Sequence, residues 1–345
     1  MSQLGSQILS DAAIVAADES IPWDRLDNRS FVVTGATGLI GKNLVSALLA
    51  RGTTDIILLV RNPEKARRLF GTSDKVSIIS WEALESGVPN GLPEHVDYVI
   101  HCANVTDSSS FIERPVETIE STLGGARSAI QIARQYGARL CLLSTMETYG
   151  EYLSDEPLKE DQGGFLDAMV VRNSYPEAKR LDEALCAAYA SEYGLGAVVL
   201  RLSQTFGPGV ARDDRRVFAE FARCALEERD IVLLTDGRKR NAYLYTSDAV
   251  RAILIVAACG QAGTAYNAAN EATFCSIREM AEMVANTLGG GKTKVRIEIN
   301  PDAAKRFRKG STLRLDTTRL EKLGWKARVN LPEMYNRMTK AWAEV

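Results

Sequence analysis

The stretch Phe31-Val32-Val33-Thr34-Gly35-Ala36-Thr37-Gly38-Leu39-Ile40-Gly41 decides how this chain folds. An apolar run leads into a glycine-rich turn, and the pattern from Lys42 to Arg51 is that of a helix. A strand, a glycine turn and a helix N-terminus in this order let backbone N–H groups and the helix dipole face a pyrophosphate. The spacing Gly-x-x-Gly-x-x-Gly differs from Gly-x-Gly-x-x-Gly, and Asn43 after Gly41-Lys42 excludes a P-loop. A turn with a purely structural role is the alternative.

Short apolar runs separated by helix-length segments continue from this turn. Runs this apolar are typical of strands buried on both faces, and the long segments between them supply the crossover helices. We therefore predict an α/β fold with a doubly wound parallel sheet. The predicted strands are Phe31 to Thr34, Ile56 to Val60, Val76 to Ile79, Tyr98 to Cys102, Leu140 to Leu143, Ala197 to Leu202 and Ala265 to Ala268.

Turn signals become denser after Leu202, which indicates a smaller, partly interleaved C-terminal region that binds substrate. Residues 30–202 plus 241–268 are expected to form the dinucleotide-binding domain, and residues 203–240 plus 269–345 the substrate region. Residues 1–29 precede the first strand and are predicted to be an appended polar helical extension with a packing or dimer role.

Composition excludes several classes of protein. The 345 residues carry 42 Lys and Arg against 44 Asp and Glu, so a nucleic-acid partner is not expected. The two histidines and six dispersed cysteines suggest neither a metal centre nor a disulfide framework. No apolar run is long enough for a membrane span, and the N-terminus does not resemble a secretory signal, so we expect a cytoplasmic protein.

Arg61 stands where a dinucleotide-binding strand often ends in an acidic residue for the ribose of NAD. That acidic residue is absent, and a guanidinium there is suited to the 2′-phosphate of NADP. Arg61 is equally interpreted as a solvated side chain at the start of a basic helix. The sequence therefore leaves NAD and NADP both open.

Tyr175 and Lys179 stand four residues apart around Pro176, which suits the first turn of a helix. Both side chains then lie on one side of that helix. A nearby ammonium, together with a cationic nicotinamide, is expected to lower the pKa of the Tyr175 phenol from about 10, so that it acts as a base. On its own, an exposed helix pair explains the same spacing.

These motifs together resemble the extended short-chain dehydrogenase/reductase superfamily, in particular its nucleotide-sugar epimerase/dehydratase group. The resemblance extends from about residue 30 to the C-terminus. It is carried by the glycine turn, His101-Cys102-Ala103, Ser144-Thr145-Met146-Glu147-Thr148-Tyr149-Gly150, Tyr175 with Lys179, Arg201 through Gly209, Tyr243 to Asp248, Ala265-Tyr266-Asn267 and Leu323-Gly324-Trp325.

The resemblance implies a Rossmann-type fold and transient oxidation of a nucleotide-diphosphate sugar at C4. NAD or NADP would be tightly bound and recycled, and a homodimer is expected. Tyr175 would accept the proton of the 4-hydroxyl, Thr145 would relay it, and Lys179 would bind the ribose. The residues expected to line the cofactor are Gly35, Thr37, Gly38, Leu39, Ile40, Gly41, Arg61, Cys102, Ala103, Tyr175 and Lys179.

Glu147 bears on the outcome of the reaction. Dehydratases of this family typically carry Asp-Glu after the threonine, whereas this chain has Met146-Glu147. A thioether cannot protonate a leaving hydroxyl, but a carboxylate base toward C5 remains. Epimerisation is therefore favoured, with 4,6-dehydration or a decarboxylation of the UDP-glucuronate type as alternatives. Glu147 could instead only order its loop.

Departures from the family pattern leave the sugar and the nucleotide open. Gln204 replaces a common asparagine, and Asn241, beside Arg240, stands where relatives place an arginine for the diphosphate. The residues expected to bind substrate are Thr106, Met146, Gln204, Arg216, Arg240, Asn241 and Arg314.

Two further functions remain open. One is a reductase of the same superfamily that consumes free NADPH, which Arg61 favours. The other is a non-catalytic dinucleotide sensor, because a fold alone does not establish activity. A sensor has no need for Thr145, Tyr175 and Lys179 together, so the enzymatic interpretation is preferred.

Overall fold

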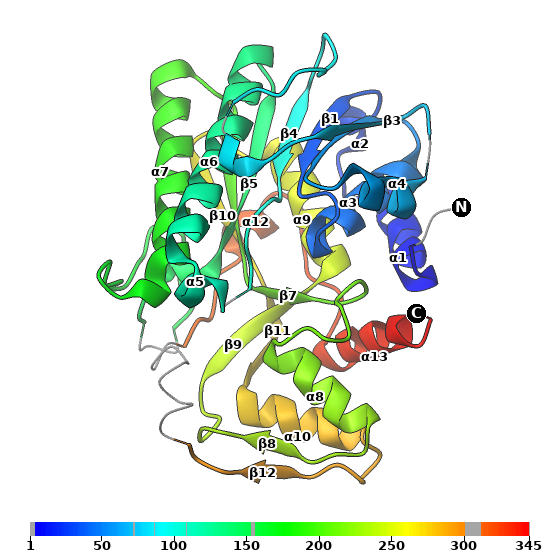
Figure 1. The fold of residues 1–345 in the computed structure, drawn as a ribbon, viewed down its shortest axis with the longest axis vertical. Coiled ribbons are helices and arrows are strands. Elements are labelled where there is room, and N and C mark those ends of the chain that lie inside the picture. The colour runs from blue at the N-terminus through cyan, green and yellow to red at the C-terminus, as the bar shows by residue number, and fades with distance from the viewer. Residues whose placement is uncertain are drawn as a thin grey trace.

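A seven-stranded parallel sheet forms the centre of the computed structural model, with strand order β10-β6-β5-β4-β1-β2-β3 (Figure 1). The structure describes residues 4–71, 73–85, 87–107, 109–152, 156–300 and 312–344. The predicted parallel, doubly wound sheet is confirmed. Its strands are β1 (Ser30–Thr34), β2 (Asp55–Val60), β3 (Val76–Ser80), β4 (Tyr98–His101), β5 (Arg139–Thr145), β6 (Ala197–Leu202) and β10 (Thr264–Ala268).

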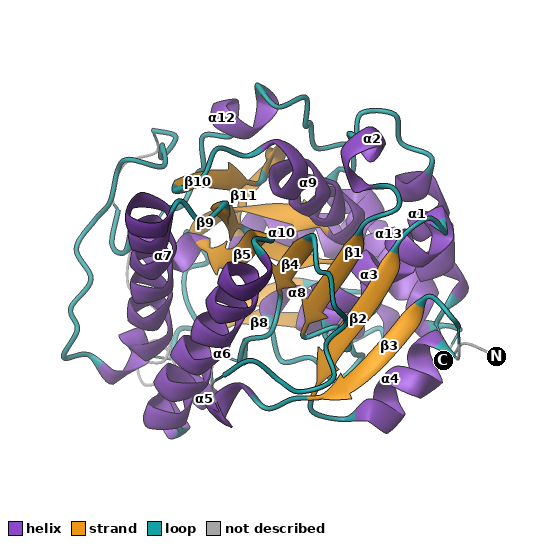
Figure 2. Ribbon diagram, turned by 90° about the horizontal axis from the view of Figure 1, so that it is seen from above, coloured by secondary structure: helices purple, strands orange, loops and turns teal. Residues whose placement is uncertain are grey.

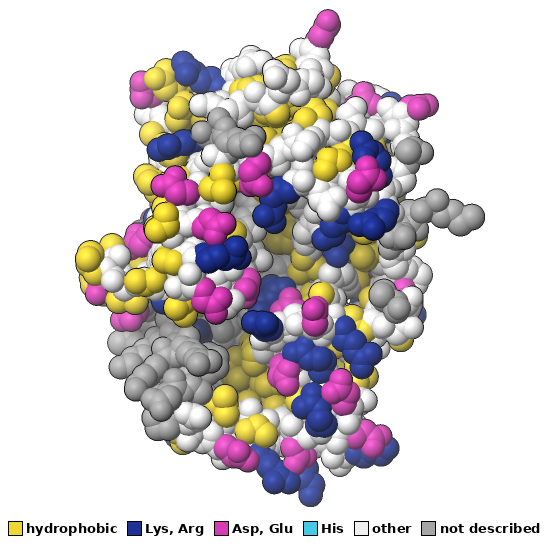
Figure 3. Space-filling model, in the orientation of Figure 1, with side chains coloured by type: hydrophobic (Ala, Val, Ile, Leu, Met, Phe, Trp, Pro, Cys, Tyr) yellow, Lys and Arg dark blue, Asp and Glu magenta, His cyan; other side chains and the backbone are white. Residues whose placement is uncertain are grey.

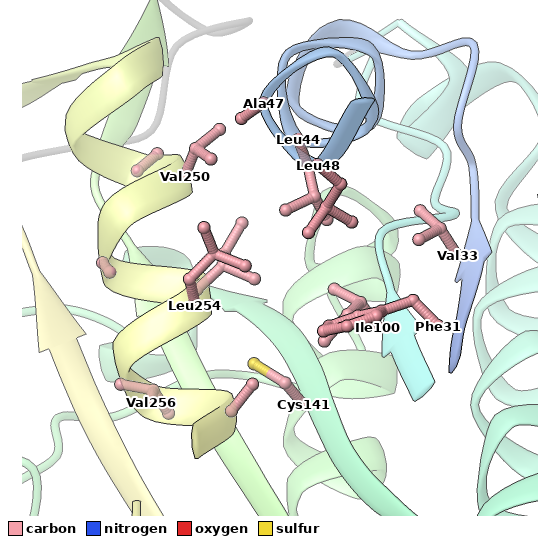
Figure 4. Close-up of a cluster of buried hydrophobic side chains, with 14 of the residues drawn as sticks. Phe31, Val33, Leu44, Ala47, Leu48, Ile100, Cys141, Val250, Leu254 and Val256 are labelled. Atoms are coloured by element: carbon pink, nitrogen blue, oxygen red, sulfur yellow. The ribbon is translucent and has the colours of Figure 1, made fainter. Parts of the chain in front are cut away.

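Helices cover both faces of this sheet. On one face α3 (Leu39–Arg51) and α9 (Thr246–Cys259) bury side chains against Phe31 and Val33 of β1 (Figure 4). On the other face α6 (Pro115–Tyr136) packs on Val32, and α7 (Ser174–Tyr193) lies beside α6 (Figure 2). Alternate side chains of β1 face opposite helical layers. Because each set is buried against helices, both sets must be apolar, which explains the continuous hydrophobic run in the sequence.

A second lobe lies below the sheet in Figure 1 and has its own apolar core. It holds a three-stranded sheet, β11-β9-β7, and a pair of strands, β12-β8. Its elements are β7 (Gln204–Phe206), α8 (Val217–Leu226), β8 (Ile231–Leu233), β9 (Arg240–Tyr245), β11 (Asn270–Ser276), α10 (Ile277–Thr287), β12 (Val295–Ile297) and α13 (Leu331–Trp342).

The chain leaves the large sheet after β6 and returns to it through α9 and β10, so the two lobes are interleaved. The remaining short elements are α4 (Pro63–Phe70), η1 (Ala83–Glu85), α5 (Ser110–Glu113), η2 (Met146–Tyr149), η3 (Val171–Asn173) and α12 (Thr318–Glu321). The residue boundaries proposed for the two regions stay predictions. Residues 301–311 and 345 of the predicted substrate region lie outside the described residues.

The N-terminal segment folds as α1 (Ser6–Ala16) and α2 (Trp23–Leu26). The segment is helical, as predicted, but α1 is amphipathic and not polar throughout. Its apolar face, which includes Ala12 and Val15, is buried against the core that contains α3. Residues 1–3 lie outside the described part of the chain. The backbone N–H of Ser6 donates to Glu344 at 2.8 Å, so the segment also reaches the C-terminal end of the chain.

Candidate functional site

The glycine turn joins β1 to α3 and presents a bare backbone. Gly35 has a φ of +65°, and a Cβ there would lie 2.6 Å from the Ala103 nitrogen. A Cβ on Gly41 would lie 2.2 Å from the Gly35 carbonyl oxygen, so this glycine allows α3 to pack against the turn. Gly38 is exposed immediately before α3 and no side chain caps the helix. The first N–H groups of α3 and its positive dipole end are therefore available to a phosphate.

The end of β4 lies directly beside this turn. The backbone N–H of Ala103 donates to Thr34 Oγ1 at 3.1 Å, and the Thr34 hydroxyl lies 2.9 Å from Nδ1 of His101. Burial, and secondarily the charge of Lys179, lowers the pKa of His101 to about 3, so the ring is neutral. Burial likewise raises the pKa of the Cys102 thiol to about 12. His101 therefore has a packing role, and the uncharged Cys102 lines the turn.

Basic side chains surround the end of β2. Arg61 follows Val60 and is exposed. Burial, and then the charge of Lys65, lowers the pKa of Lys42, which shows that the two ammonium groups are near each other. Sequence analysis missed Lys42, whose Nζ donates to the Gly209 carbonyl at 2.8 Å and so ties α3 to the second lobe.

Tyr175 and Lys179 lie on the buried side of the first turns of α7, as their spacing predicts. The Tyr175 ring stacks on Phe111 at 4.5 Å with an interplanar angle of 6°. Lys179 is fully buried, and its Nζ donates to the Leu143 carbonyl at 3.0 Å and to Asp182 Oδ2 at 3.1 Å. Sequence analysis missed Phe111 and Asp182.

In the protein alone the Tyr175 pKa is not lowered, and the predicted lowering, which includes the cationic nicotinamide, stays a prediction. Burial raises the pKa of this phenol well above its usual range, and the negative charges of Glu147 and Asp182 raise it further. The physical reason is that a phenolate is poorly solvated in this buried position, while the ammonium expected to favour it is paired with a carboxylate. Any favourable charge must therefore come from a bound ligand.

Thr145 and Glu147 stand where β5 ends and η2 begins. Thr145 Oγ1 accepts the backbone N–H of Glu147 at 3.2 Å. The Glu147 carboxylate accepts from Arg172 at 3.1 Å, and the Arg172 guanidinium lies 5.0 Å from the Phe111 ring centroid. Phe111 thus contacts both the Tyr175 ring and Arg172. Sequence analysis missed Arg172, although its position three residues before Tyr175 was a usable signal.

A second group of predicted residues gathers on β9, β11 and residue 314. The guanidinium groups of Arg240 and Arg314 lie 4.7 and 5.6 Å from the ring centroid of Phe274. We call these three residues the arginine–phenylalanine cluster. Asn241 is buried and bridges to the backbone of Leu313. Sequence analysis missed Phe274.

The arginine–phenylalanine cluster adjoins the end of β5 through a small apolar core. Met146 and Phe274 both pack against that core, which contains Tyr149, Leu158, Ala242, Ala269, Leu313 and Leu315. Gln204 pairs with Tyr243 on the neighbouring strand, two residues beyond Asn241. The structure therefore brings Met146, Gln204, Arg240, Asn241 and Arg314 into one region next to the Thr145 loop.

Thr106 and Arg216 belong to two loops outside this cluster. Arg216 pairs with Asp214 at 2.6 Å and lies over the Phe218 ring at 4.8 Å. Hydrogen bonds from Ser109 lower the pKa of Asp107, and the charge of Arg215 adds to this effect, so the two loops approach each other. Figure 3 shows that the surface is hollowed between the two lobes, with apolar and basic side chains in the hollow.

Comparison with known proteins assigns the family. The model of the NAD dependent epimerase/dehydratase family matches residues 31–269. The chain belongs to this family. The family is enzymatic and NAD-dependent, and the match includes the glycine turn, Tyr175 and β9.

Two curated relatives of this epimerase/dehydratase chain have nearly the same sequence identity to it. UDP-glucuronic acid decarboxylase 1 of Arabidopsis thaliana is 28% identical over 314 residues, which cover 89% of this chain and 68% of the relative. UDP-glucuronic acid decarboxylase 1 of Xenopus tropicalis is 27% identical over 321 residues, which cover 90% and 71% of the two chains.

Solved structures of the same fold include epimerases and dehydratases. UDP-N-acetylglucosamine 4-epimerase from Methanobrevibacter ruminantium M1 has a TM-score of 0.79 at 20% identity, over 92% of this chain and 99% of that chain. The dTDP-glucose 4,6-dehydratase DesIV from Streptomyces venezuelae, solved with NAD bound, has a TM-score of 0.75 at 21% identity, over 91% and 97%. These similarities confirm the Rossmann-type fold.

The described residues hold neither a membrane-spanning helix nor a metal-binding cluster. No helix in this part of the chain is long and apolar enough to cross a membrane. No cluster of three or more His, Cys, Asp or Glu side chains among the same residues is placed to hold a metal ion.

Proposed function

We propose that this protein is an NAD(P)-dependent nucleotide-sugar enzyme that acts through transient oxidation at sugar C4. The observation that carries the proposal is the buried pair of Tyr175 and Lys179 on α7, next to the end of β5 and to the glycine turn of β1. In this proposal Tyr175 takes the proton of the 4-hydroxyl and Thr145 relays it by hydrogen bonding. Lys179 directs its remaining N–H toward the ribose.

The residues around the glycine turn fit a dinucleotide. The missing Cβ atoms of Gly35 and Gly41 leave a close backbone cradle, and the exposed Gly38 lets a pyrophosphate approach the start of α3. Thr37, Leu39 and Ile40 would complete this cradle, and Cys102 and Ala103 would form its wall. Arg61 is exposed directly after β2, where its guanidinium is suited to the 2′-phosphate of NADP, and this supports NADP over NAD. The chemistry that NAD(P) would supply when held there is reversible hydride acceptance from sugar C4.

The arginine–phenylalanine cluster is proposed to hold the nucleotide diphosphate. Arg240 and Arg314 offer cationic donors, and the Phe274 ring keeps both guanidinium planes oriented. Asn241 and Gln204 would contact the remaining polar groups, while Met146 would lie against the sugar. Thr106 and Arg216 would close the other side from their two loops.

The fate of the keto intermediate is the open choice. A ketone at C4 acidifies the neighbouring C–H bonds, which permits epimerisation, elimination or decarboxylation. Epimerisation remains our first candidate because Met146 cannot serve as the acid of a 4,6-elimination. Decarboxylation is the second candidate, favoured by the placement of Glu147 and Arg172 beside Phe111 and Tyr175 and by the 27–28% identity to UDP-glucuronic acid decarboxylases.

The first experiment is NMR of the purified protein in D2O with UDP-, GDP-, CDP- and dTDP-sugars, including a UDP-uronate. Conversion without added cofactor supports an internally recycled NAD(P). An inverted centre identifies an isomerase, and release of CO2 or water identifies a lyase. Conversion only with stoichiometric NADPH would support the reductase instead. Absence of any conversion would support the sensor and contradict the proposal.

Substitution of Tyr175 by Phe tests the proposed base. The variant keeps the stack on Phe111 but has no proton acceptor, so we expect turnover to fall about a thousandfold, within the usual range for acid–base groups. Cofactor retention and thermal unfolding should stay unchanged. Full activity in Tyr175→Phe would eliminate this mechanism.

A homodimer formed through α6 and α7 is also proposed. The two helices lie side by side, and each exposes an apolar residue, Val116 on α6 and Leu181 on α7. These two side chains are where the proposed interface can be tested by substitution. Sedimentation at micromolar concentration should give a dimer, and Val116→Glu with Leu181→Glu should give a monomer. A monomeric wild-type protein would remove the claim.

A further inference from the structure

Asp182 is a buried carboxylate that the proposed mechanism does not use. Tyr175, Lys179 and Asp182 stand at positions i, i+4 and i+7 of α7, so all three lie on one side of the helix. Lys179 and Asp182 are both fully buried, and their charged atoms are 3.1 Å apart. Charged groups this deep in a protein require a partner.

The Lys179 ammonium is held by the protein on two sides. One proton points to the Leu143 carbonyl near the end of β5, and a second points to Asp182. An ammonium has three protons, so only one remains for a ligand. This arrangement fixes the direction of the third N–H, and it also places a negative charge beside the only cation on this face of α7.

Two negative charges act on Tyr175. Asp182 belongs to α7 itself and is paired with Lys179, and Glu147 belongs to η2 and is paired with Arg172 of η3. Asp182 in turn is faced by Lys179 and Glu183. Burial raises the pKa of Asp182 to about 6 in spite of the nearby Lys179, so the carboxylate is ionised at neutral pH and protonated in mild acid.

We propose that Asp182 is a positioning residue: it anchors the Lys179 ammonium against the end of β5 and cancels part of the charge that Lys179 would present to Tyr175. This inference rests on the proposed function of Tyr175 as the base. It implies that Asp182 keeps the pKa of Tyr175 high in the protein alone, and that the positive charge of a bound nicotinamide would be needed to lower this pKa. Tyr175 then ionises only when the cofactor is in place.

The test uses Asp182→Asn, which keeps the shape of the side chain and an oxygen for Lys179 but removes the charge. We expect the limb of the pH profile of kcat that reports Tyr175 to move about one unit toward lower pH, because a neighbouring negative charge is lost. The KM for the nucleotide sugar should not change. Structural damage would instead alter KM and kcat together at every pH.

Glu177→Gln is the matched control. Glu177 lies on the same helix and nearer to Tyr175 in sequence, but it is partly exposed and faces Arg180 at 3.8 Å. Its removal should leave the pH profile unchanged. An equal shift in both variants, or no shift in Asp182→Asn, would overturn the proposal. If Asp182→Asn does not fold, Asp182→Ser provides a second uncharged variant with the same expected shift.

A readout without turnover separates this inference from the proposed function. The Cζ carbon of Tyr175 in the protein loaded with oxidised NADP, labelled with ¹³C and assigned with Tyr175→Phe, reports ionisation of the phenol directly. Its midpoint should fall by about one unit in Asp182→Asn. Titrations to pH 11 that coincide in the two proteins contradict the role of Asp182, even if no nucleotide sugar is converted. Turnover by the wild type with coincident profiles contradicts the role of Asp182 but not the function.

Discussion

The glycine turn and the arginine–phenylalanine cluster are built in opposite ways. The turn consists of consecutive residues from the end of β1 into the first turn of α3, and its shape depends on the absence of side chains at Gly35 and Gly41. The cluster consists of side chains from β9, β11 and residue 314, and it exists only because the tertiary fold brings Arg240 and Arg314 to Phe274. A binding site made by consecutive backbone groups can therefore be predicted from a sequence, whereas one made by side chains from distant segments cannot.

The same contrast explains why the cofactor side was easier to specify than the substrate side. A strand–turn–helix unit has one geometry that suits a phosphate. A nucleotide diphosphate can be bound by cations that come from many positions in a sequence, so no single motif predicts the site. The anion-binding charge is proposed to reside on Arg240 and Arg314.

The largest effect is expected at Gly41. A Cβ at this position would lie 2.2 Å from the Gly35 carbonyl oxygen, so Gly41→Ala must displace α3 from the turn. We expect a loss of about 3 kcal/mol in the free energy of unfolding, at the upper end of the cost of overpacking, together with loss of cofactor binding. Urea unfolding and cofactor titration measure the two quantities.

Gly38→Ala is the matched comparison within the same turn. Its Cβ would lie 3.2 Å from the Gly35 oxygen, and its φ of −79° suits any residue. We expect stability to change by less than about 1 kcal/mol while cofactor affinity falls, because the methyl group stands where the phosphate approaches. Equal stabilities for Gly38→Ala and Gly41→Ala would show that the close approach at Gly41 has been overestimated.

The central sheet was predictable, because its strands are short apolar runs and the crossovers between them are separate helix patterns, whereas the strands of the second lobe, such as β11 (Asn270–Ser276), have no such run. Tyr175 and Lys179 were predictable for a similar reason, since their spacing of four places them on one helix face. Phe111 was not, because it reaches Tyr175 from the short helix α5. Asp182 lies on the same helix face, but a charge on a helix is usually solvated, and burial of this one is a tertiary effect.

An intermediate effect is expected where the N-terminal segment joins the two lobes. Burial alone would raise the pKa of Asp18, but hydrogen bonds from Ser20 and Arg328 and the charge of Arg251 lower it to about 2. The carboxylate therefore stabilises the fold above the unfolded-state value of 3.8, and this contribution is lost as the pH falls toward 2. Asp18→Asn should lower the free energy of unfolding by about 2 kcal/mol at pH 7.

Acid titration of stability distinguishes this role from a general loss of packing. The difference between wild type and Asp18→Asn should shrink below about pH 4 and vanish near pH 2. Asp24→Asn, on the exposed side of α2, should match the wild type at every pH. A difference for Asp18→Asn that does not depend on pH would contradict the electrostatic account. Separate unfolding of the two lobes in this variant would show that Asp18, through Arg251 and Arg328, couples them.

The smallest effect is expected in the arginine–phenylalanine cluster. Arg240→Gln and Arg314→Gln each remove one cation but leave the Phe274 ring and the partner guanidinium in place. We expect KM for the nucleotide sugar to rise about tenfold in each variant with kcat nearly unchanged, because the diphosphate is bound equally in the ground state and the transition state. Arg278→Gln, which removes an exposed arginine paired with Glu282 in the same lobe, is the control and should behave as wild type. Because both arginines contact one ring, their effects should not be additive. The rise in KM of the double variant should therefore differ from the product of the rises in the two single variants. Strict additivity would mean that the two cations act on separate groups of the substrate, and that the phenylalanine between them is only a packing residue.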